Sequence, residues 1–171
     1  MLELRLATGP DQAFLRALHA ARRAGEFTAV GLAPAALQAL LAMQYEAQAR
    51  AYALAYPEAS RQLVLWQGRP VGALWWHAGP GQLRLLDIGL LPTRCGQGLG
   101  SACLRRLQQQ ACERGQVLLL QVAEDNPARR LYARLGFQVL RRQGLHLEMC
   151  WPPAAAASPP SPMTCQGAPS C

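Results

Sequence analysis

Three alternate glycines, Gly96, Gly98 and Gly100, stand at the start of a predicted amphipathic helix, and this arrangement constrains the fold more than any other stretch. Glycine leaves the backbone N–H groups uncovered and permits left-handed backbone conformations. The first turn of a helix adds N–H groups without helical acceptors and about half a positive charge. We therefore predict an anion-binding corner over residues 95–101, suited to a phosphate group.

Hydrophobic periodicity predicts a mixed α/β domain around this corner. Alternating apolar and polar residues indicate strands, whereas apolar residues three or four positions apart indicate helices. The expected strands are 2–7, 61–66, 71–78, 83–91, 117–122, 137–142 and 145–151. The expected helices are 8–23, 34–56, 99–114 and 127–135. Because a helix separates strands 83–91 and 117–122, we expect them to pair in parallel through a right-handed crossover.

Local signals define the ends and faces of several elements. Thr8 and Asp11 have the spacing of a capping box for the first helix, and Gly25 is expected to end that helix. Along helix 34–56, polar and aromatic residues form a stripe at Gln44, Gln48, Tyr52 and Tyr56. Two interpretations of the stripe stay open: it lines a substrate groove, or its tyrosines cover the edge of the core.

The helix after the glycines has a clear apolar face. The residues expected to face inward are Cys103, Leu104, Leu107 and Ala111, with Cys112 as a further small buried residue. The neighbouring Gln108, Gln109 and Gln110 are expected to face water. In the last hairpin, Leu145, Leu147, Met149 and Trp151 are expected on one side.

The length of 171 residues fits one domain, which we place at residues 1–151. Residues 152–171 contain six prolines and no charged residue, and we expect a disordered tail. No apolar run is long enough for a membrane span, and the polar N-terminus does not resemble a signal peptide. We therefore expect a cytoplasmic protein that does not interact with membranes.

The basic residues are all arginines, and they are unevenly distributed. Residues 81–150 hold ten arginines against five acids, whereas residues 1–80 hold seven against five. The excess therefore lies in the half with the glycine corner and suits a polyanionic ligand, either a nucleotide cofactor or nucleic acid.

Three classes of site do not fit these residues. A P-loop requires lysine, and the chain has none. A Rossmann fingerprint belongs after the first strand of a parallel sheet, whereas this corner follows several strands. The six cysteines form no CxxC pair and no histidine lies at zinc spacing, so we expect no metal.

Two motifs in order carry a family resemblance. The sequence LLPTRCGQGLGSACL, followed about thirty residues later by NPARRLYARLGF, resembles the GNAT superfamily of acyl-CoA-dependent N-acyltransferases, over residues 2–151. The resemblance implies a GNAT fold: a central, mostly antiparallel twisted sheet with one splayed parallel pair and helices on both faces. It implies acetyl-CoA as the acyl donor and an amine as the acceptor.

The resemblance also implies which residues hold coenzyme A. Backbone amides of the motif Q/R-x-x-G-x-G/A wrap the pyrophosphate in that family, and the pantetheine arm pairs with the strand before it. The positions that match are Ile88, Gly89, Leu90, Cys95, Gly96, Gln97, Gly98, Leu99, Gly100, Ser101, Asn126 and Arg129. Cys95 departs from the usual Gln or Arg, and Asn126 stands six rather than seven residues before the motif tyrosine, so it could serve only as a helix cap.

Tyr132, the tyrosine of the second motif, is implied to be the general acid. A phenol with a pKa of about 10 is protonated at neutral pH and can donate a proton as the thiolate of coenzyme A forms. The alternative is a tyrosine that only packs with Leu131 and Leu135. The general base is open: Asp87 and Glu124 are candidates, and each could equally be a structural or solvated carboxylate.

A site without a strong base favours weakly basic amines. An α-amino group, with a pKa of about 7.7–8.0, is neutral far more often at pH 7 than a lysine-like amine near 10.4. We therefore expect transfer of an acetyl group to a primary amine of a small molecule or peptide. Two alternatives stay open: a non-catalytic acyl-CoA sensor, suggested by Cys95 and the missing base, and an acetyltransferase for aminoacyl-tRNA, suggested by the arginine excess. Apart from the tRNA alternative, we do not expect the protein to bind nucleic acid. Whether it forms a homodimer stays open.

Overall fold

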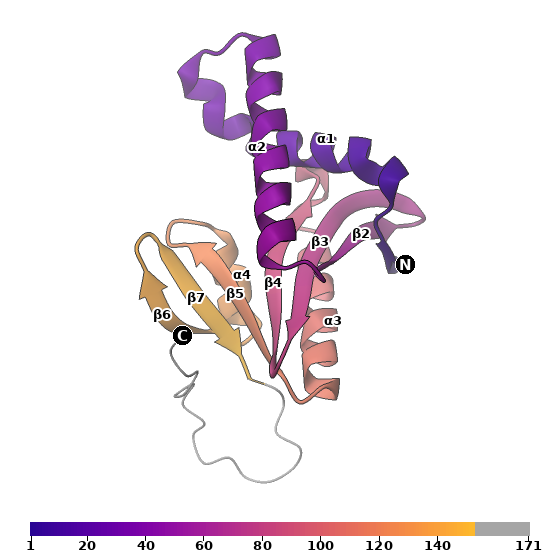
Figure 1. The fold of residues 1–171 in the computed structure, drawn as a ribbon, viewed down its shortest axis with the longest axis vertical. Coiled ribbons are helices and arrows are strands. Elements are labelled where there is room, and N and C mark those ends of the chain that lie inside the picture. Colours follow the sequence, from indigo (N-terminus) through magenta and orange to yellow (C-terminus); the bar gives the residue numbers. More distant parts are fainter. Residues whose placement is uncertain (153–171) are drawn as a thin grey trace. The chain divides into compact units, whose positions relative to one another are not determined.

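The computed structural model describes residues 1–152, which form a mixed α/β fold (Figure 1). Within these residues, seven strands join one sheet, mostly antiparallel with one parallel pair. The chain divides into two compact units, Met1–His77 with Leu86–Cys103, and Ala78–Leu85 with the chain from Leu104 onward. The strand order is β1-β2-β3-β4 in the first unit and β4-β5-β7-β6 in the second, since β4 runs through both.

The first unit is built on an antiparallel ladder. Strands β1 (Leu2–Leu6), β2 (Ser60–Trp66) and β3 (Arg69–Gly79) pair in sequence, and β4 (Gln82–Leu90) follows β3. The turn between β2 and β3 is Gln67–Gly68, with φ of 52° and 74°. Left-handed conformations at both positions match the twist of a two-residue hairpin. The predicted hairpin is thus confirmed, with a turn two residues shorter than expected.

The predicted capping box is present, but it begins a short 3-10 helix, Gly9–Asp11, and helix α1 (Gln12–Arg23) follows that turn directly. The Asp11 carboxylate accepts hydrogen bonds from the Thr8 backbone N–H at 2.8 Å and the Thr8 hydroxyl at 2.9 Å. The prediction that Gly25 ends the helix is wrong in detail. The chain continues as a 3-10 helix over Ala24–Val30 and turns only at Gly31, whose φ is 66°.

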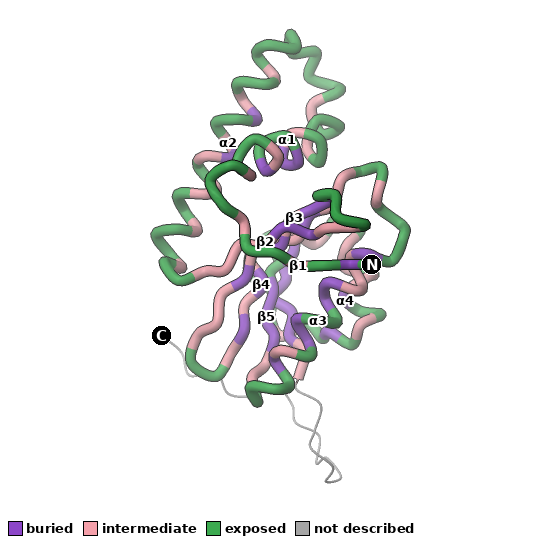
Figure 2. Tube along the Cα trace, turned by 90° about the vertical axis from the view of Figure 1, so that its right-hand side faces the viewer, coloured by how far each residue is buried: buried purple, intermediate pink, exposed green. Residues whose placement is uncertain are grey.

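Helix α2 (Pro34–Ala55) matches the predicted span closely. Leu41 and Tyr45 are buried along it, and Tyr45 joins Leu15 and Leu63 in a core cluster of the first unit. The outward residues of α2 are exposed, with Leu54 at 83% (Figure 2). In Figure 2 buried segments lie on β3, β4 and β5 and also on helices α1 and α3.

The second unit contains the parallel pair. The pairing of β4 with β5 (Val117–Ala123) runs from Gln82 opposite Val117 to Leu85 opposite Leu120. Helix α3 (Leu99–Glu113) lies between the two strands in the chain, so the expected parallel pairing across a helix is confirmed. Helix α4 (Ala128–Arg134) precedes the antiparallel hairpin of β6 (Gln138–Gln143) and β7 (His146–Trp151).

The apolar face predicted for α3 is confirmed. Three other predictions of exposure or burial are wrong, two of them on α3 and one in the last hairpin. Cys103, Leu104, Leu107 and Ala111 have no exposed surface. Gln108 is buried instead of solvent-facing, because its Nε2 donates to the Leu135 carbonyl at 2.8 Å. Cys112 is exposed. Leu145 lies in the hairpin turn, 79% exposed, rather than on the buried side of β7.

The predicted tail, residues 152–171, lies almost wholly outside the described residues. In the described part of the chain, no helix is long and apolar enough to cross a membrane.

Candidate functional site

The glycine corner has the conformation that its sequence predicts. A short 3-10 turn, Pro92–Arg94, leads into it, and both Gly96 and Gly98 have positive φ, 75° and 78°. Such values are unfavourable for residues with a Cβ. The first backbone hydrogen bond of α3 runs from the Ala102 N–H to the Gly98 carbonyl. The N–H groups of Leu99, Gly100 and Ser101 therefore lie in the first turn, where a helix supplies no acceptor.

The corner is open to a ligand. A Cβ placed on Gly96 or Gly98 would meet no atom within 4 Å, and Cys95, Gln97 and both glycines are exposed. Uncovered amides at the start of a 15-residue helix favour an anion through their partial charges. The Cys95 thiol contacts the Leu91 carbonyl at 3.6 Å. Arg94 is half-buried next to it.

An arginine side chain from α1 contacts the strand that precedes the glycine corner. Arg22 donates to both carboxylate oxygens of Asp87, at 2.9 and 3.2 Å, and to the Ile88 carbonyl at 3.0 Å. A Cβ on Gly89 would lie only 2.2 to 2.6 Å from the Arg22 guanidinium. Gly89 therefore makes room for the arginine. The Ile88 carbonyl, predicted to pair with a ligand, already has one donor, while Leu90 is half-buried.

Tyr132 lies on α4 in the second unit. Its ring is buried and packs edge-on against Phe137, with 5.7 Å between ring centroids. Helix α4 is held at its start by Asn126, whose Oδ1 accepts from the Ala128 N–H at 2.9 Å. The N-cap residue of α4 is Pro127 rather than Asn126, so the Asn126 side chain supports the turn that leads into the helix. Arg129 donates from Nη1 to the Glu124 carbonyl.

The two candidate bases are both paired with arginines. Glu124 accepts from Arg142 at 2.6 Å in the second unit, just as Asp87 accepts from Arg22 in the first. In both pairs an arginine side chain occupies the carboxylate oxygens. Each would have to rearrange, or act through water, to serve as a base.

A pocket in the first unit lies next to Asp87. It is lined by residues of α1, α2, β2, β3 and β4, among them His19, Arg22, Tyr45, Arg61, Trp75 and Asp87. His19 is 7% exposed, and its Nε2 has no hydrogen-bond partner in the described chain. Burial lowers the pKa of His19, and the charges of Arg23 and Arg22 act in the same direction. The imidazole is therefore neutral at pH 7.

The tyrosine stripe of α2 covers this side of the sheet. Tyr52 packs edge-on against Trp75, with centroids 4.9 Å apart, and its hydroxyl donates to the Leu86 carbonyl at 2.9 Å. Burial raises the pKa of Tyr52, and the charge of Asp87 adds to this effect. Gln48 lines the pocket. Tyr52 thus covers the strands, as one interpretation of the stripe predicts, and Gln48 lines a pocket; that the stripe lines a substrate groove stays a prediction.

The family follows from a sequence match to this same region. The model of the acetyltransferase (GNAT) family matches residues 33–137, which include the glycine corner and Tyr132. The chain belongs to the GNAT family. Comparison with curated protein sequences gives no match.

Solved structures agree with the GNAT fold. The PaiA N-acetyltransferase of Thermoplasma acidophilum, in complex with coenzyme A, aligns with a TM-score of 0.70 at 14% identity, over 89% of this chain and 99% of that one. An acetyltransferase of Thermus thermophilus gives 0.66 at 21% identity, over 89% and 97%. The ribosomal-protein-S18-alanine N-acetyltransferase of Escherichia coli gives 0.60 at 19%, over 92% and 97%. At these identities the likeness concerns the fold.

Two residues that line the pocket of this GNAT chain were not predicted from the sequence as site residues. His19 and Arg61 belong to no motif, and isolated histidines are commonly structural. The signal for Arg61 was the strand alternation of residues 61–66, which places every second side chain on one face. The signal for His19 was its position one turn after Leu15 on the apolar side of α1. Within residues 1–152, no group of three His, Cys, Asp or Glu side chains is placed to hold a metal.

Proposed function

We propose that this protein transfers an acetyl group from acetyl-CoA to a primary amine of a small molecule or peptide. The observation that carries the proposal is the open glycine corner, with Gly96 and Gly98 at positive φ before α3, within a chain of an acetyltransferase family. Residues 95–101 are proposed to bind the pyrophosphate through backbone N–H groups. The backbone of residues 88–90 is proposed to pair with the pantetheine arm, and Asn126 and Arg129 are proposed to assist.

The reaction is a direct attack. The amine nitrogen bonds to the thioester carbonyl carbon, the C–S bond breaks, and coenzyme A leaves as a thiolate. One proton passes from Tyr132 to that thiolate, and the nitrogen loses one proton to a carboxylate or water. A phenol is suited to the first transfer, because its ordinary pKa of about 10 leaves it protonated at neutral pH and able to donate as the thiolate forms.

The choice of amine follows from the paired carboxylates. Since Asp87 and Glu124 both bind arginines, neither is a free base for a fully protonated amine. We expect α-amino groups to react faster than lysine-like amines at pH 7, because more of the α-amine is already neutral. An Asp87→Asn, Glu124→Gln double variant with undiminished activity on lysine-like amines at neutral pH would contradict this expectation.

The same pairing supports a second candidate, a non-catalytic acyl-CoA sensor. Both candidate bases are held by arginines, and Cys95 is exposed at the ligand corner. A protein of this kind binds acetyl-CoA without releasing coenzyme A when amines are added.

One experiment separates the two candidates. Acetyl-CoA binding is measured by calorimetry, and coenzyme A release across an amine panel is measured by liquid chromatography. A thiol reagent is unsuitable as the readout, because Cys95 and Cys112 are exposed. Binding with amine-dependent release supports the acetyltransferase, binding alone supports the sensor, and no binding overturns both.

A further inference from the structure

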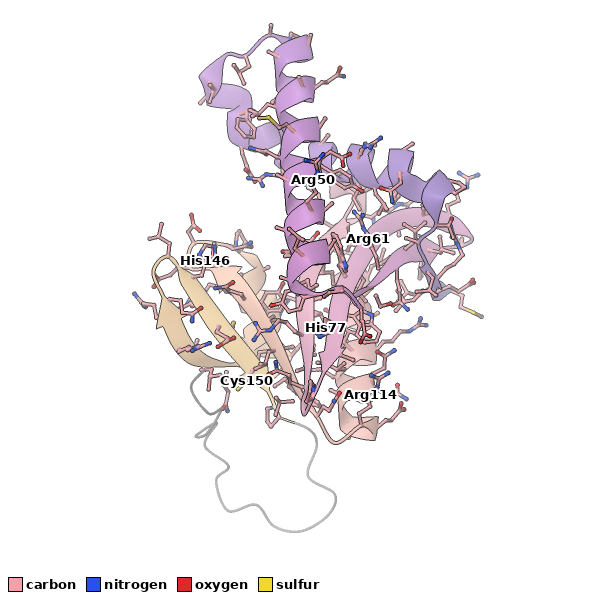
Figure 3. All side chains as sticks on the ribbon, in the orientation of Figure 1. Arg50, Arg61, His77, Arg114, His146 and Cys150 are labelled. Carbon is pink, nitrogen blue, oxygen red and sulfur yellow. The ribbon has the colours of Figure 1, made fainter. Side chains whose placement is uncertain are left out.

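Arg61 is the charged group of the first-unit pocket for which residues 1–152 provide no anionic partner. Its guanidinium carbon lies 4.4 Å from the ring centroid of Trp75 and 5.1 Å from that of Tyr45. Arg61 and Trp75 are direct cross-strand partners on β2 and β3, so they share one face of the sheet. Figure 3 labels Arg61 next to α2 and β3. Two aromatic faces thus hold the cation in place.

The N–H groups at the edge of the Arg61 guanidinium remain available to a ligand. Throughout residues 1–152, Arg61 has ring contacts and no hydrogen bond or ion pair from its side chain. Asp87, the carboxylate of the pocket, is occupied by the bidentate contact with Arg22. Since His19 is neutral, the pocket holds two arginines and one aspartate and has a net positive charge. An arginine stacked on its faces can still form a fork of two N–H bonds to a carboxylate.

His19 provides an independent sign of a ligand. Its Nε2 is buried in the pocket wall, and the described chain offers it no partner. A buried polar atom without a hydrogen bond costs free energy, which a bound oxygen or nitrogen would recover. The pocket is narrow and reaches solvent, so a carboxylate group fits in it while the remainder of its molecule stays outside.

We propose that this pocket binds a carboxylate of the acceptor, with Arg61 as its main contact, so that the substrates are amines that also carry a carboxylate. This inference rests on the proposed function, because it takes the bound molecule to be the acceptor of the acetyl group. The carboxylate site itself does not depend on catalysis. Arg61 is then a residue that determines specificity. It has no part in the transfer of the acetyl group.

The test compares acids with their amides. Glycine, β-alanine and 4-aminobutyrate are titrated against glycinamide, β-alaninamide and 4-aminobutanamide, with intrinsic tryptophan fluorescence as the readout. Trp75 stacks on Arg61, so a bound carboxylate changes its emission, and Trp75→Phe identifies this signal among the four tryptophans. We expect at least one acid to bind ~10-fold or more tightly than its amide, because charge-assisted bidentate bonds are the strong ones. The same preference is expected in kcat/KM.

Three variants locate the effect. Arg61→Gln should bring acid and amide to equal affinity, and Arg61→Lys, which keeps the charge without the fork, should retain part of the preference. Arg50→Gln, an exposed arginine of α2 also labelled in Figure 3, should leave the preference unchanged. Circular dichroism verifies folding, and Arg61→Lys carries the test if Arg61→Gln does not fold.

The outcomes separate this inference from the proposed function. Equal binding of every acid and amide, absence of binding by all acids at millimolar concentration, or a preference that persists in folded Arg61→Gln overturns the carboxylate site. Acetyl transfer to amines without any carboxylate preference does so too, and leaves the acetyltransferase intact. Carboxylate binding at Arg61 without acetyl transfer supports the site and counts against the acetyltransferase.

Discussion

The carboxylate of Asp87 is bound by both terminal nitrogens of Arg22, a residue 65 positions earlier in the chain. Both side chains are about one-third exposed, at 31% and 30%, so water screens part of the attraction. The contact joins the end of α1 to β4 beside the glycine corner. It therefore orients the strand segment that we propose for the pantetheine arm.

A double-mutant cycle measures this pair. Arg22→Gln, Asp87→Asn and the double variant are unfolded with urea, and we expect a coupling free energy of about 1 kcal/mol. The value lies above that of a fully exposed pair because the geometry is bidentate. The exposed pair of Arg16 and Glu46 is the control, with a smaller expected coupling. Equal coupling in both cycles would show that the Arg22 contact adds nothing specific.

Substitution of a glycine in the corner should weaken ligand binding by more than its effect on stability explains. Gly98→Ala places a Cβ at φ 78° in open space, so only backbone strain of about 1–2 kcal/mol opposes it. Gly68→Ala, with φ 74° and equally open surroundings in the β2–β3 turn, is the matched control. We expect similar thermal destabilisation for both, with acetyl-CoA affinity lowered ~10-fold or more for Gly98→Ala alone. Unchanged affinity in Gly98→Ala would remove the corner from the ligand site.

Tyr132 provides a test of the general acid. Tyr132→Phe keeps the edge-on packing with Phe137 and removes the hydroxyl. We expect kcat to fall by about 100-fold or more, the usual range for loss of an acid catalyst, with acetyl-CoA affinity near that of the natural protein. Tyr56→Phe, at the ring contact with His77, should leave kcat unchanged. Equal kcat values for natural protein and Tyr132→Phe would leave Tyr132 with a packing role only.

Local sequence signals predicted the parts of the fold that depend on local physics. Pro34 begins α2 and Pro57 follows its end, because proline suits the first turn of a helix and stops its continuation. The positive φ of Gly96 and Gly98 was predictable because a turn into a helix at this spacing requires residues without a Cβ. The buried face of α3 followed from a 3.6-residue period.

Contacts between distant segments were not predictable in this way. Gly89 was predicted as a ligand contact, but nothing in the sequence indicated that its missing side chain also makes room for Arg22. Gln108 lies buried because a carbonyl at the end of α4, that of Leu135, is within reach of its amide. Arg61 meets Trp75 only through the register of β2 and β3. Each of these contacts depends on which elements pack together, and periodicity carries no information about that.

A buried ion cluster in the second unit predicts how stability depends on pH. Glu148 on β7, 5% exposed at its side chain, accepts from Arg84 at 2.8 Å and from Arg141 at 2.6 Å. Desolvation alone would raise the pKa of Glu148, but the hydrogen bonds from Arg84 and Arg141 outweigh it, so its pKa lies below the ordinary value. Its charged form is therefore favoured in the folded protein.

Glu148→Gln should cost on the order of 2 kcal/mol at pH 7, less than for a fully buried pair because Arg141 is 59% exposed. Since the folded pKa lies below the unfolded one, the stabilisation is complete above about pH 4.3 and is lost as the pH falls through the folded pKa. Urea unfolding of both proteins between pH 7 and 3 should therefore show a gap that is constant near neutrality and closes in acid. Glu113→Gln, at an exposed position on α3, should show no such gap. A gap that stays the same at pH 3 would mean that Glu148 stabilises the hairpin by its shape and hydrogen bonding rather than by its charge.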